Sequence, residues 1–362
     1  MTEHGYIRAL LDAKGIGLNV ALQLMQHFGS AAAIFDNRTS LPKQVADRLV
    51  VTDDTMRRID QEEAFCDKNH IAILTYNDAA YPQRLRECAD APLALYYRGN
   101  ADLNARHIIS VVGTRRITER GKDIVAQFCR DIAQLVPDAL IVSGLAYGVD
   151  IHAHRAALQN GLSTVAVLAH GLDRIYPNYH RQTAVDMLSQ GGLLTEFTSG
   201  TTPFAGNFVS RNRIVAGLCD TTVVVESAEK GGALITAHLA QEYNRDVFAF
   251  PGRINDEFSA GCNKIIRKNV AALITKAADM TEALNWSTTP QTQHIIQPEI
   301  FPDLSAEESK LVDALTGVEQ KSIIELTQDT QLPFHKTMQL LLELELKGMI
   351  KGLPGGIYRL LR

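Results

Sequence analysis

The chain has 362 residues, of which 46% are hydrophobic, and this is enough to bury a large core and to form two or three domains. Its formal net charge of -5 excludes a protein that coats polyanions with its whole surface. Any contact with nucleic acid must come from a local basic patch. The sequence shows no secretion signal and no apolar run of membrane-spanning length, so we expect a cytoplasmic protein without a membrane contact.

The cysteines and the closely spaced histidines predict no metal site. His152 and His154 flank Ala153 at a predicted helix start, where alternate residues diverge and favour packing over a shared ion. The cysteines lie far apart without a CxxC pair, which is typical of reduced, structural thiols. They are Cys66, Cys88, Cys129, Cys219 and Cys262.

Residues 1–66 are predicted to form a helical domain of the SAM or helix-hairpin-helix type. Lys14-Gly15-Ile16-Gly17 precedes an apolar-periodic segment that begins at Val20, as a turn between two paired helices would. The glycine N–H groups of such a turn can meet a phosphate. A short GxG between helices is also ordinary turn chemistry, so DNA contact and a plain turn both stay open.

Residues 67–287 are predicted to form one domain, which from Ile108 onward alternates short apolar runs with segments of helical spacing, for instance Ile124, Phe128, Ile132 and Leu135. Runs that are apolar throughout are typical of strands covered on both faces. We therefore predict an α/β fold with a Rossmann-like, doubly wound, mostly parallel sheet, whose ligand site lies where the strand order reverses. The predicted strands are Ile108–Val112, Ala139–Val142, Thr164–Ala169, Leu193–Phe197, Thr221–Val225, Val247–Phe250 and Ala271–Ile274.

The first of these runs ends in the basic loop Gly113-Thr114-Arg115-Arg116, which is followed by Thr118, Arg120 and Lys122. Guanidinium groups match the geometry of phosphate, and the N-terminus of the next helix adds unpaired N–H groups. A solvated basic helix start capped by Thr118 explains the same residues. A second arginine cluster elsewhere in the sheet domain favours phosphate binding.

That second cluster is Phe208–Arg213 (FVSRNR), just ahead of the apolar run at Thr221. Two arginines, an amide and an aromatic ring are the parts of a groove for nucleic acid, and they are not those of a bond-breaking centre. We expect Arg115, Arg211 and Arg213 to converge at one edge of the sheet.

A glycine turn, Lys230-Gly231-Gly232, opens a predicted helix after the run near Glu226. Its backbone can approach a phosphate or a sugar, although a tight strand-to-helix turn needs the same residues. Gly121-Lys122 is not the end of a P-loop, because Arg116 stands where glycine is required and Asp123 where Ser or Thr is required. No GxGxxG follows a strand. The sequence thus predicts neither a nucleoside triphosphatase nor a dinucleotide cofactor.

Residues 288–302 are polar and proline-spaced, which indicates a linker. Residues 303–362 carry three helix-like segments and then two short strands around a glycine turn, the order of a winged helix. The third helix, Pro333–Lys347, offers Lys336 but also two glutamates. We therefore favour a protein contact or a stability role over duplex reading for this domain.

Several specific motifs occur in order between Tyr81 and Ile274. They are Gly113–Arg115, Ser143–Asp150, Gly171–Pro177, Arg211–Leu218, Phe250–Gly252 and Gly261–Asn263. With them the chain closely resembles the DNA-processing protein A family, also called DprA or Smf. Val209 stands where that family often has proline, and Gly231 where it commonly has serine, which leaves the path of a bound strand undefined.

The resemblance implies a protein, and not an enzyme, that binds single-stranded DNA without strong sequence preference and protects it. It also implies a homodimer that helps to load the RecA recombinase onto incoming strands during natural transformation. The candidate DNA-binding residues are Gly113, Thr114, Arg115, Phe208, Arg211, Asn212, Arg213, Lys230, Gly231 and Gly232.

Physical chemistry suggests a role for each side chain among these candidates. We assign Arg115, Arg211 and Arg213 to phosphates, Phe208 to base stacking, and Asn212 to a base edge or to bracing of the loop. All but Arg115 have the alternative of fixing the loop internally.

The competing hypothesis is an enzyme. Rossmann-like proteins of the lysine-decarboxylase-like family hydrolyse nucleoside monophosphates through a PGGxGT turn and a nearby glutamate. Here Lys230 replaces the proline, Leu234 replaces the later glycine, and the expected helix position holds no glutamate. A catalytic acid or base must lie within hydrogen-bond reach of its substrate. A phosphoribohydrolase is therefore the alternative, and a protein-docking adaptor with structural arginines is the third hypothesis.

Overall fold

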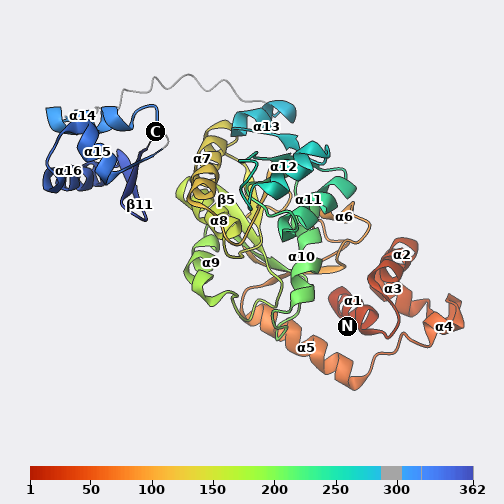
Figure 1. The fold of residues 1–362 in the computed structure, drawn as a ribbon. Coiled ribbons are helices and arrows are strands. Elements are labelled where there is room, and N and C mark those ends of the chain that lie inside the picture. Colours follow the sequence, from red (N-terminus) through yellow and green to blue (C-terminus); the bar gives the residue numbers. More distant parts are fainter. Residues whose placement is uncertain (287–303, 319, 362) are drawn as a thin grey trace. The chain divides into compact units, whose positions relative to one another are not determined.

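The structure, a computed structural model, describes residues 1–286, 304–318 and 320–361 (Figure 1). It divides into two compact units, Met1–Thr289 and Pro290–Arg362. The predicted linker, residues 288–302, lies outside the described residues. Within the described ranges, no helix has the length and apolar character needed to cross a bilayer.

The first unit is built on a nine-stranded sheet in the order β1-β2-β6-β5-β4-β3-β7-β8-β9. From β6 to β9 all neighbouring strands are parallel, while β2 pairs antiparallel with β1 and β6. The mostly parallel Rossmann-like prediction is therefore confirmed. The strands are β1 Ala72–Thr75, β2 Ala94–Gly99, β3 Ile108–Val112, β4 Leu140–Ser143, β5 Ser163–Val167, β6 Gly191–Thr195, β7 Thr221–Val224, β8 Asp246–Ala249 and β9 Ala272–Leu273.

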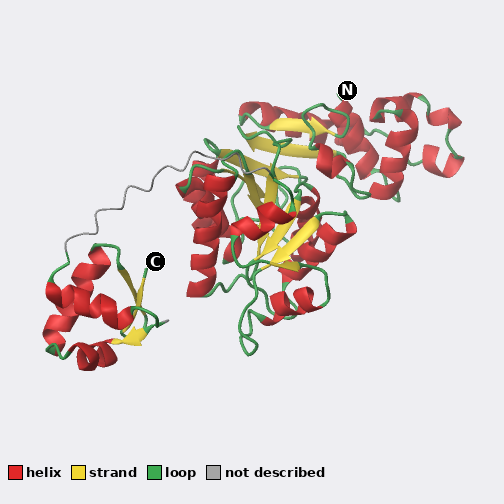
Figure 2. Ribbon diagram, turned by 90° about the horizontal axis from the view of Figure 1, so that it is seen from above, coloured by secondary structure: helices red, strands yellow, loops and turns green. Residues whose placement is uncertain are grey.

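Helices cover both faces of this sheet (Figures 1 and 2), which explains why its central strands are apolar throughout. Ile108 and Val112 pack in the same core as α10 and α11, whereas Ile109 and Val111 pack with α7 and α8. The period of two along a strand sends these pairs to opposite faces. The helical segments are α6 Gln83–Arg86, α7 Glu119–Leu135, α8 Val149–Gln159, η2 Asn178–His180, α9 Arg181–Met187, α10 Ala205–Gly217, α11 Gly232–Glu242, α12 Ala260–Arg267 and α13 Ala277–Ala283.

The N-terminal residues are helical, and they pack against the sheet unit. A core shared by α1, α2 and α3 includes Leu93 and Ala94 at the start of β2, and His4 hydrogen-bonds the Tyr96 hydroxyl at 2.9 Å. The predicted boundary at residue 66 falls inside α5. These helical segments are α1 Glu3–Asp12, α2 Leu18–Phe28, α3 Ala31–Asp36, η1 Arg38–Ser40, α4 Lys43–Ala46 and α5 Asp53–Lys68.

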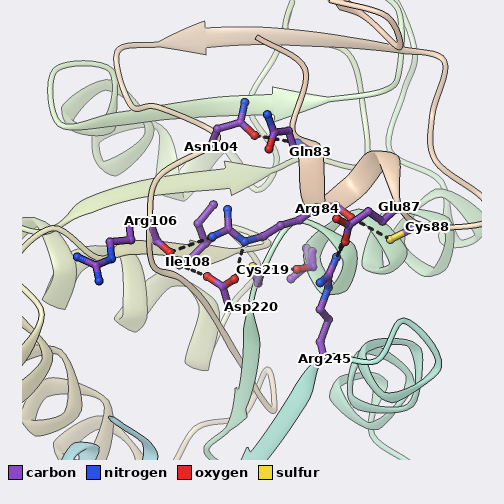
Figure 3. Close-up of polar contacts among 11 residues, drawn as sticks. Gln83, Arg84, Glu87, Cys88, Asn104, Arg106, Ile108, Cys219, Asp220 and Arg245 are labelled. Carbon is purple, nitrogen blue, oxygen red and sulfur yellow. Dashed lines mark hydrogen bonds and ion pairs between the residues drawn. The ribbon is translucent and has the colours of Figure 1, made fainter. Parts of the chain in front are cut away.

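Figure 3 shows how the central strands are tied together at their amino ends. The Asp220 carboxylate, just before β7, accepts a hydrogen bond from the Ile108 N–H at 2.8 Å and from the Arg84 guanidinium of α6. Arg245 in turn donates to Glu87 and to the Arg84 carbonyl. This network holds β3 and β7 side by side at the centre of the sheet.

The second unit is a winged helix, as predicted, with a small apolar core that includes Leu311, Leu326 and Leu341. Its three-stranded sheet has the order β10-β12-β11. The elements are α14 Ala306–Leu315, β10 Lys321–Ser322, α15 Ile323–Thr330, α16 Phe334–Leu346, β11 Ile350–Leu353 and β12 Ile357–Leu360.

The structure corrects and completes the sequence-based elements. Every predicted strand is present within a few residues of its expected bounds, but the antiparallel pair β1 and β2 was not predicted. The segment Phe208–Arg213 lies inside α10 and is not a loop at a strand end. His154 is buried and hydrogen-bonds Thr164, in agreement with packing. All five cysteines are buried and free, as expected.

Candidate nucleic-acid interface

The candidate interface lies where the strand order reverses. From β3 the chain builds β4, β5 and β6 on one side and then returns to form β7, β8 and β9 on the other. Such a switch point leaves a crevice at the carboxyl ends of the strands. Here a cavity of about 700 Å³ opens between the loop after β3, the first turns of α10 and the glycine turn before α11.

Eight of the ten candidate residues line this cavity, and the exceptions are Arg213 and Lys230. The structure thus brings together segments that are about a hundred residues apart in the sequence. The eight are Gly113, Thr114, Arg115, Phe208, Arg211, Asn212, Gly231 and Gly232.

An exposed cation and two aromatic rings form the rim. The Arg115 guanidinium lies 5.3 Å from the centre of the Phe208 ring, and the Phe208 ring lies 5.9 Å from that of Tyr176. Tyr176 is 48% exposed. Because neither ring is fully covered, a planar base can stack here beside a charge that can meet its phosphate. Sequence analysis gave Tyr176 no role, although its motif Gly171–Pro177 was recognised.

The helical geometry of α10 decides which of its side chains reach the cavity. Phe208, Arg211 and Asn212 stand at i, i+3 and i+4 and share a face. Arg213 lies two positions beyond Arg211, about 200° around the axis, and is directed elsewhere. α10 follows β6, so its first turns start at the carboxyl edge of the sheet.

Arg211 forms the floor of the cavity and is 4% exposed. Its Nη1 donates to the Gly144 carbonyl at 2.8 Å and to the Val167 carbonyl. A Cβ at Gly144 would collide with this guanidinium, so a larger residue there would displace the Arg211 side chain. The assignment of Arg211 to a surface phosphate is wrong, because the backbone of β5 and of the loop after β4 already holds the side chain.

Asp150 balances this buried charge. Its Oδ2 accepts hydrogen bonds from the N–H groups of Gly144 at 3.1 Å and Ala146 at 3.4 Å. Burial raises the pKa of Asp150, and the nearby Arg211 charge and the two N–H groups oppose that rise. Burial likewise lowers the pKa of Arg211, against the effect of Asp150. Each of the two groups thus opposes the effect of burial on the pKa of the other.

The loop that leads into α8, the helix of Asp150, also braces the loop that carries Arg115. Gly148 has φ +78, a region that favours glycine, and a Cβ there would collide with the Thr114 carbonyl. The Val149 N–H donates to that same carbonyl at 3.1 Å. The motif Ser143–Asp150 is therefore a support for Thr114 and Arg115.

Arg213 is held internally. Its Nη1 donates to the Asp90 carbonyl at 2.7 Å, and its Nη2 pairs with the Glu196 carboxylate. The side chain is only 11% exposed. The assignment of Arg213 to a phosphate, and its convergence with Arg115, are therefore corrected, since its charge is already paired away from the cavity.

The rest of the basic loop after β3 is largely structural. Arg116 pairs with Glu257 at 2.7 Å and lies over the Phe258 ring at 4.9 Å. Thr118 caps α7 by accepting from the Gly121 N–H at 3.1 Å. The capping interpretation of Thr118 is confirmed, and Arg115 is left as the arginine of this loop that faces the cavity.

The glycine turn supplies open backbone at one of its two glycines. The Gly231 N–H donates to the Ala228 carbonyl at 2.9 Å, whereas Gly232 is exposed at the start of α11. Lys230 is also exposed but lines a smaller neighbouring cavity of about 220 Å³ with Lys264 and Lys268. The N-terminus of α11 thus presents its positive end at the wall of the larger cavity.

Comparison with known proteins places these features in a family. Residues 72–285 match the family model of DNA recombination-mediator protein A, and residues 297–356 match the DprA winged helix domain. The chain belongs to the DprA/Smf family. It is 38% identical over 298 residues to protein Smf of Escherichia coli, covering 78% of this chain and 75% of that protein.

Two solved DprA structures are similar to this one. DNA processing protein A of Streptococcus pneumoniae matches with a TM-score of 0.64 and 33% identity, over 78% of this chain and 98% of that one. DNA processing protein A of Helicobacter pylori, whose structure concerns its single-stranded DNA binding mode, matches with a TM-score of 0.54 and 30% identity, over 59% and 95%.

Within this DprA/Smf chain the motifs Phe250–Gly252 and Gly261–Asn263 have a structural role. The Asn263 side chain forms a reciprocal pair with Gly252, accepting from its N–H at 3.1 Å and donating to its carbonyl at 3.0 Å. This pair joins α12 to the loop after β8. Sequence reasoning recognised both motifs, but their partnership appears only in the folded chain.

Proposed function

We propose that this protein binds single-stranded DNA, without strong sequence preference, in the cavity at the switch point. The observation that carries the proposal is the exposed Arg115 guanidinium over the Phe208 ring, beside the exposed Gly232 at the start of α11. Stacking platforms combined with local positive charge are the usual means of holding a single strand.

Different groups of the cavity contact the phosphates and the bases. Arg115 and the N-terminus of α11 contact phosphates, while Phe208 and Tyr176 receive a base. Arg211, whose charge Asp150 opposes, supports the floor and makes no direct contact with the strand. Asn212 lines the same wall and is placed to contact a base edge. Lys230 contacts a DNA strand that continues past the glycine turn.

The proposed cellular role follows from family membership. The protein protects incoming single strands and helps to load the RecA recombinase onto them in natural transformation, as a cytoplasmic homodimer. Support comes from the match to the recombination-mediator family model over residues 72–285. The test is whether the protein speeds the onset of RecA ATPase activity on protein-coated single strands.

The binding test is a fluorescence-anisotropy titration of the intact chain with labelled poly-dT and with a duplex at several salt concentrations. We expect tighter binding to the single strand and an affinity that falls with salt by roughly 0.7 log units per phosphate contact per decade. Arg115→Ala should remove about one contact from that slope. Arg130→Ala, an exposed arginine of α7, is the matched control. An unchanged slope in Arg115→Ala would refute the phosphate assignment.

We further propose that the protein is not a phosphoribohydrolase. Among the described residues that line the cavity, Asp150 alone carries a carboxylate, and its Oδ2 is held by two backbone N–H groups. A general acid or base must be free to exchange a proton with substrate. Purified protein should therefore release no ribose phosphate from AMP, and measurable release would restore the enzyme hypothesis.

A further inference from the structure

Glu62 of α5 connects the N-terminal helices to the loop that precedes α10. The Ser199 N–H donates to both carboxylate oxygens, at 2.9 and 3.1 Å, and the Ser199 hydroxyl donates to Oε2. Glu62 is 7% exposed. Hydrogen bonds to a carboxylate are among the stronger ones in proteins, so this contact restrains the loop firmly.

The same loop is fixed on its other side. The Gly200 N–H donates to Asp173 at 3.0 Å, and the Gly171 N–H donates to the Thr201 carbonyl at 3.2 Å. The loop around residues 198–201 is therefore clamped between α5 and the loop of residues 171–176. An apolar contact strengthens the arrangement, because Leu172 packs against the cluster that contains Cys66 of α5.

Both clamped segments lead directly to the aromatic rim of the cavity. The first continues into α10, which begins at Ala205 with no side-chain cap and carries Phe208 in its first turn. The second carries Tyr176, whose ring lies 5.9 Å from that of Phe208. Without a cap of its own, the start of α10 takes its position from the loop that Glu62 holds.

We propose that Glu62 is a positioning residue for strand binding, through which the N-terminal helices set the spacing of Phe208 and Tyr176. This inference rests on the proposed binding of single-stranded DNA. It gives the N-terminal helices a role in affinity without a DNA contact of their own. The clamp is local: none of the ion pairs among the described residues includes Glu62, so its removal leaves no cation unpaired.

The test compares full-length Glu62→Ala and Glu62→Gln with the wild type. Strands of dT with one 2-aminopurine are titrated, and affinity, salt slope and 2-aminopurine quenching at saturation are measured. We expect Glu62→Ala to weaken binding about tenfold, close to 1.4 kcal/mol, with an unchanged salt slope and reduced quenching. Glu62→Gln keeps a carbonyl acceptor for the Ser199 N–H and should recover part of both losses.

Glu63→Ala is the matched control, because Glu63 lies next to Glu62 on α5 but bonds His4 of α1 and not the loop. Equal binding and quenching by Glu62→Ala and the wild type would overturn the inference, provided that Arg115→Ala still weakens binding. If Arg115→Ala also binds normally, the proposed function itself fails. Should Glu62→Ala not fold, Glu62→Gln decides: unchanged quenching in that folded variant would count against positioning.

Discussion

Two of the regions that could bind nucleic acid by their sequence, the sheet domain and the winged helix, differ in how their basic side chains are paired. At the switch point of the sheet, Arg115 is exposed and its contact is an aromatic ring. On α16 of the winged helix, Lys336 pairs with Glu307, and just beyond the helix Lys347 pairs with Glu308 at 2.6 Å.

The exposed face of α16 is also apolar. It carries Phe334, Met338, Leu342 and Leu346, which are 51 to 81% exposed. A helix that reads duplex DNA needs polar and basic groups on the face that enters the groove. A candidate strand site is therefore distinguished by unpaired charge beside open backbone, and not by the number of basic residues. This comparison also supports a protein contact as the proposed role of the winged helix.

The largest effect is expected at the floor of the cavity. Arg211→Ala removes two hydrogen bonds and leaves Asp150 buried without its cationic neighbour, so we expect a loss of about 3–5 kcal/mol in unfolding free energy. Urea unfolding followed by the fluorescence of Trp286, the one tryptophan of the chain, measures it in the sheet unit. A variant as stable as the wild type would show that Arg211 is available to the strand after all.

Phe208→Ala tests the rim of the same site. Loss of one stacking platform should weaken binding to dT strands by about 1–3 kcal/mol. The melting temperature should change little, because the ring is only partly buried. Phe204→Ala is the control, since this ring is 67% exposed and does not line the cavity. Equal affinities of the two variants would remove Phe208 from the site.

The two units should also respond differently to acid. Burial lowers the pKa of His154 to about 3, and Arg211 and His180 reinforce the shift. The unfolded chain then binds the proton first, so His154 by itself lowers the stability of the sheet unit as pH falls below about 6.5, by about 1.4 kcal/mol per pH unit. His335, the histidine of the described winged helix, is exposed.

Unfolding of the sheet unit at pH 7 and pH 5.5 measures this loss. The unfolding free energy of His154→Gln should fall less steeply with decreasing pH than that of the wild type, by the slope that corresponds to about one proton. An identical pH dependence of the two proteins would contradict the assignment to His154.

The smallest effect is expected on the winged helix. Lys336→Ala breaks an ion pair near the surface, and such pairs contribute about 0–1 kcal/mol. We expect no measurable change in affinity for a duplex or a single strand, because this lysine already neutralises Glu307. A loss of duplex binding comparable with that of Arg115→Ala on single strands would invalidate the contrast between the two regions.

Much of the architecture could be predicted because it depends on local patterns. Strands covered on both faces are continuous apolar runs, and β3 and β7 were predicted to within one residue. The antiparallel strands β1 and β2 escaped prediction since they form the edge of the sheet outside the alternating strand–helix pattern. The motifs of the glycine turn and of Gly113–Arg115 likewise identified two of the segments that line the cavity.

The fold class, the winged helix and the segments that meet at the cavity could be predicted, because they follow from periodicity and motif order. Which of the three arginines is free depends on the folded chain. Arg211 and Arg213 are equivalent in the sequence, yet burial beneath Gly144 holds the first and the Glu196 carboxylate the second. The pairing of a charge depends on neighbours from distant segments, and no local pattern records them.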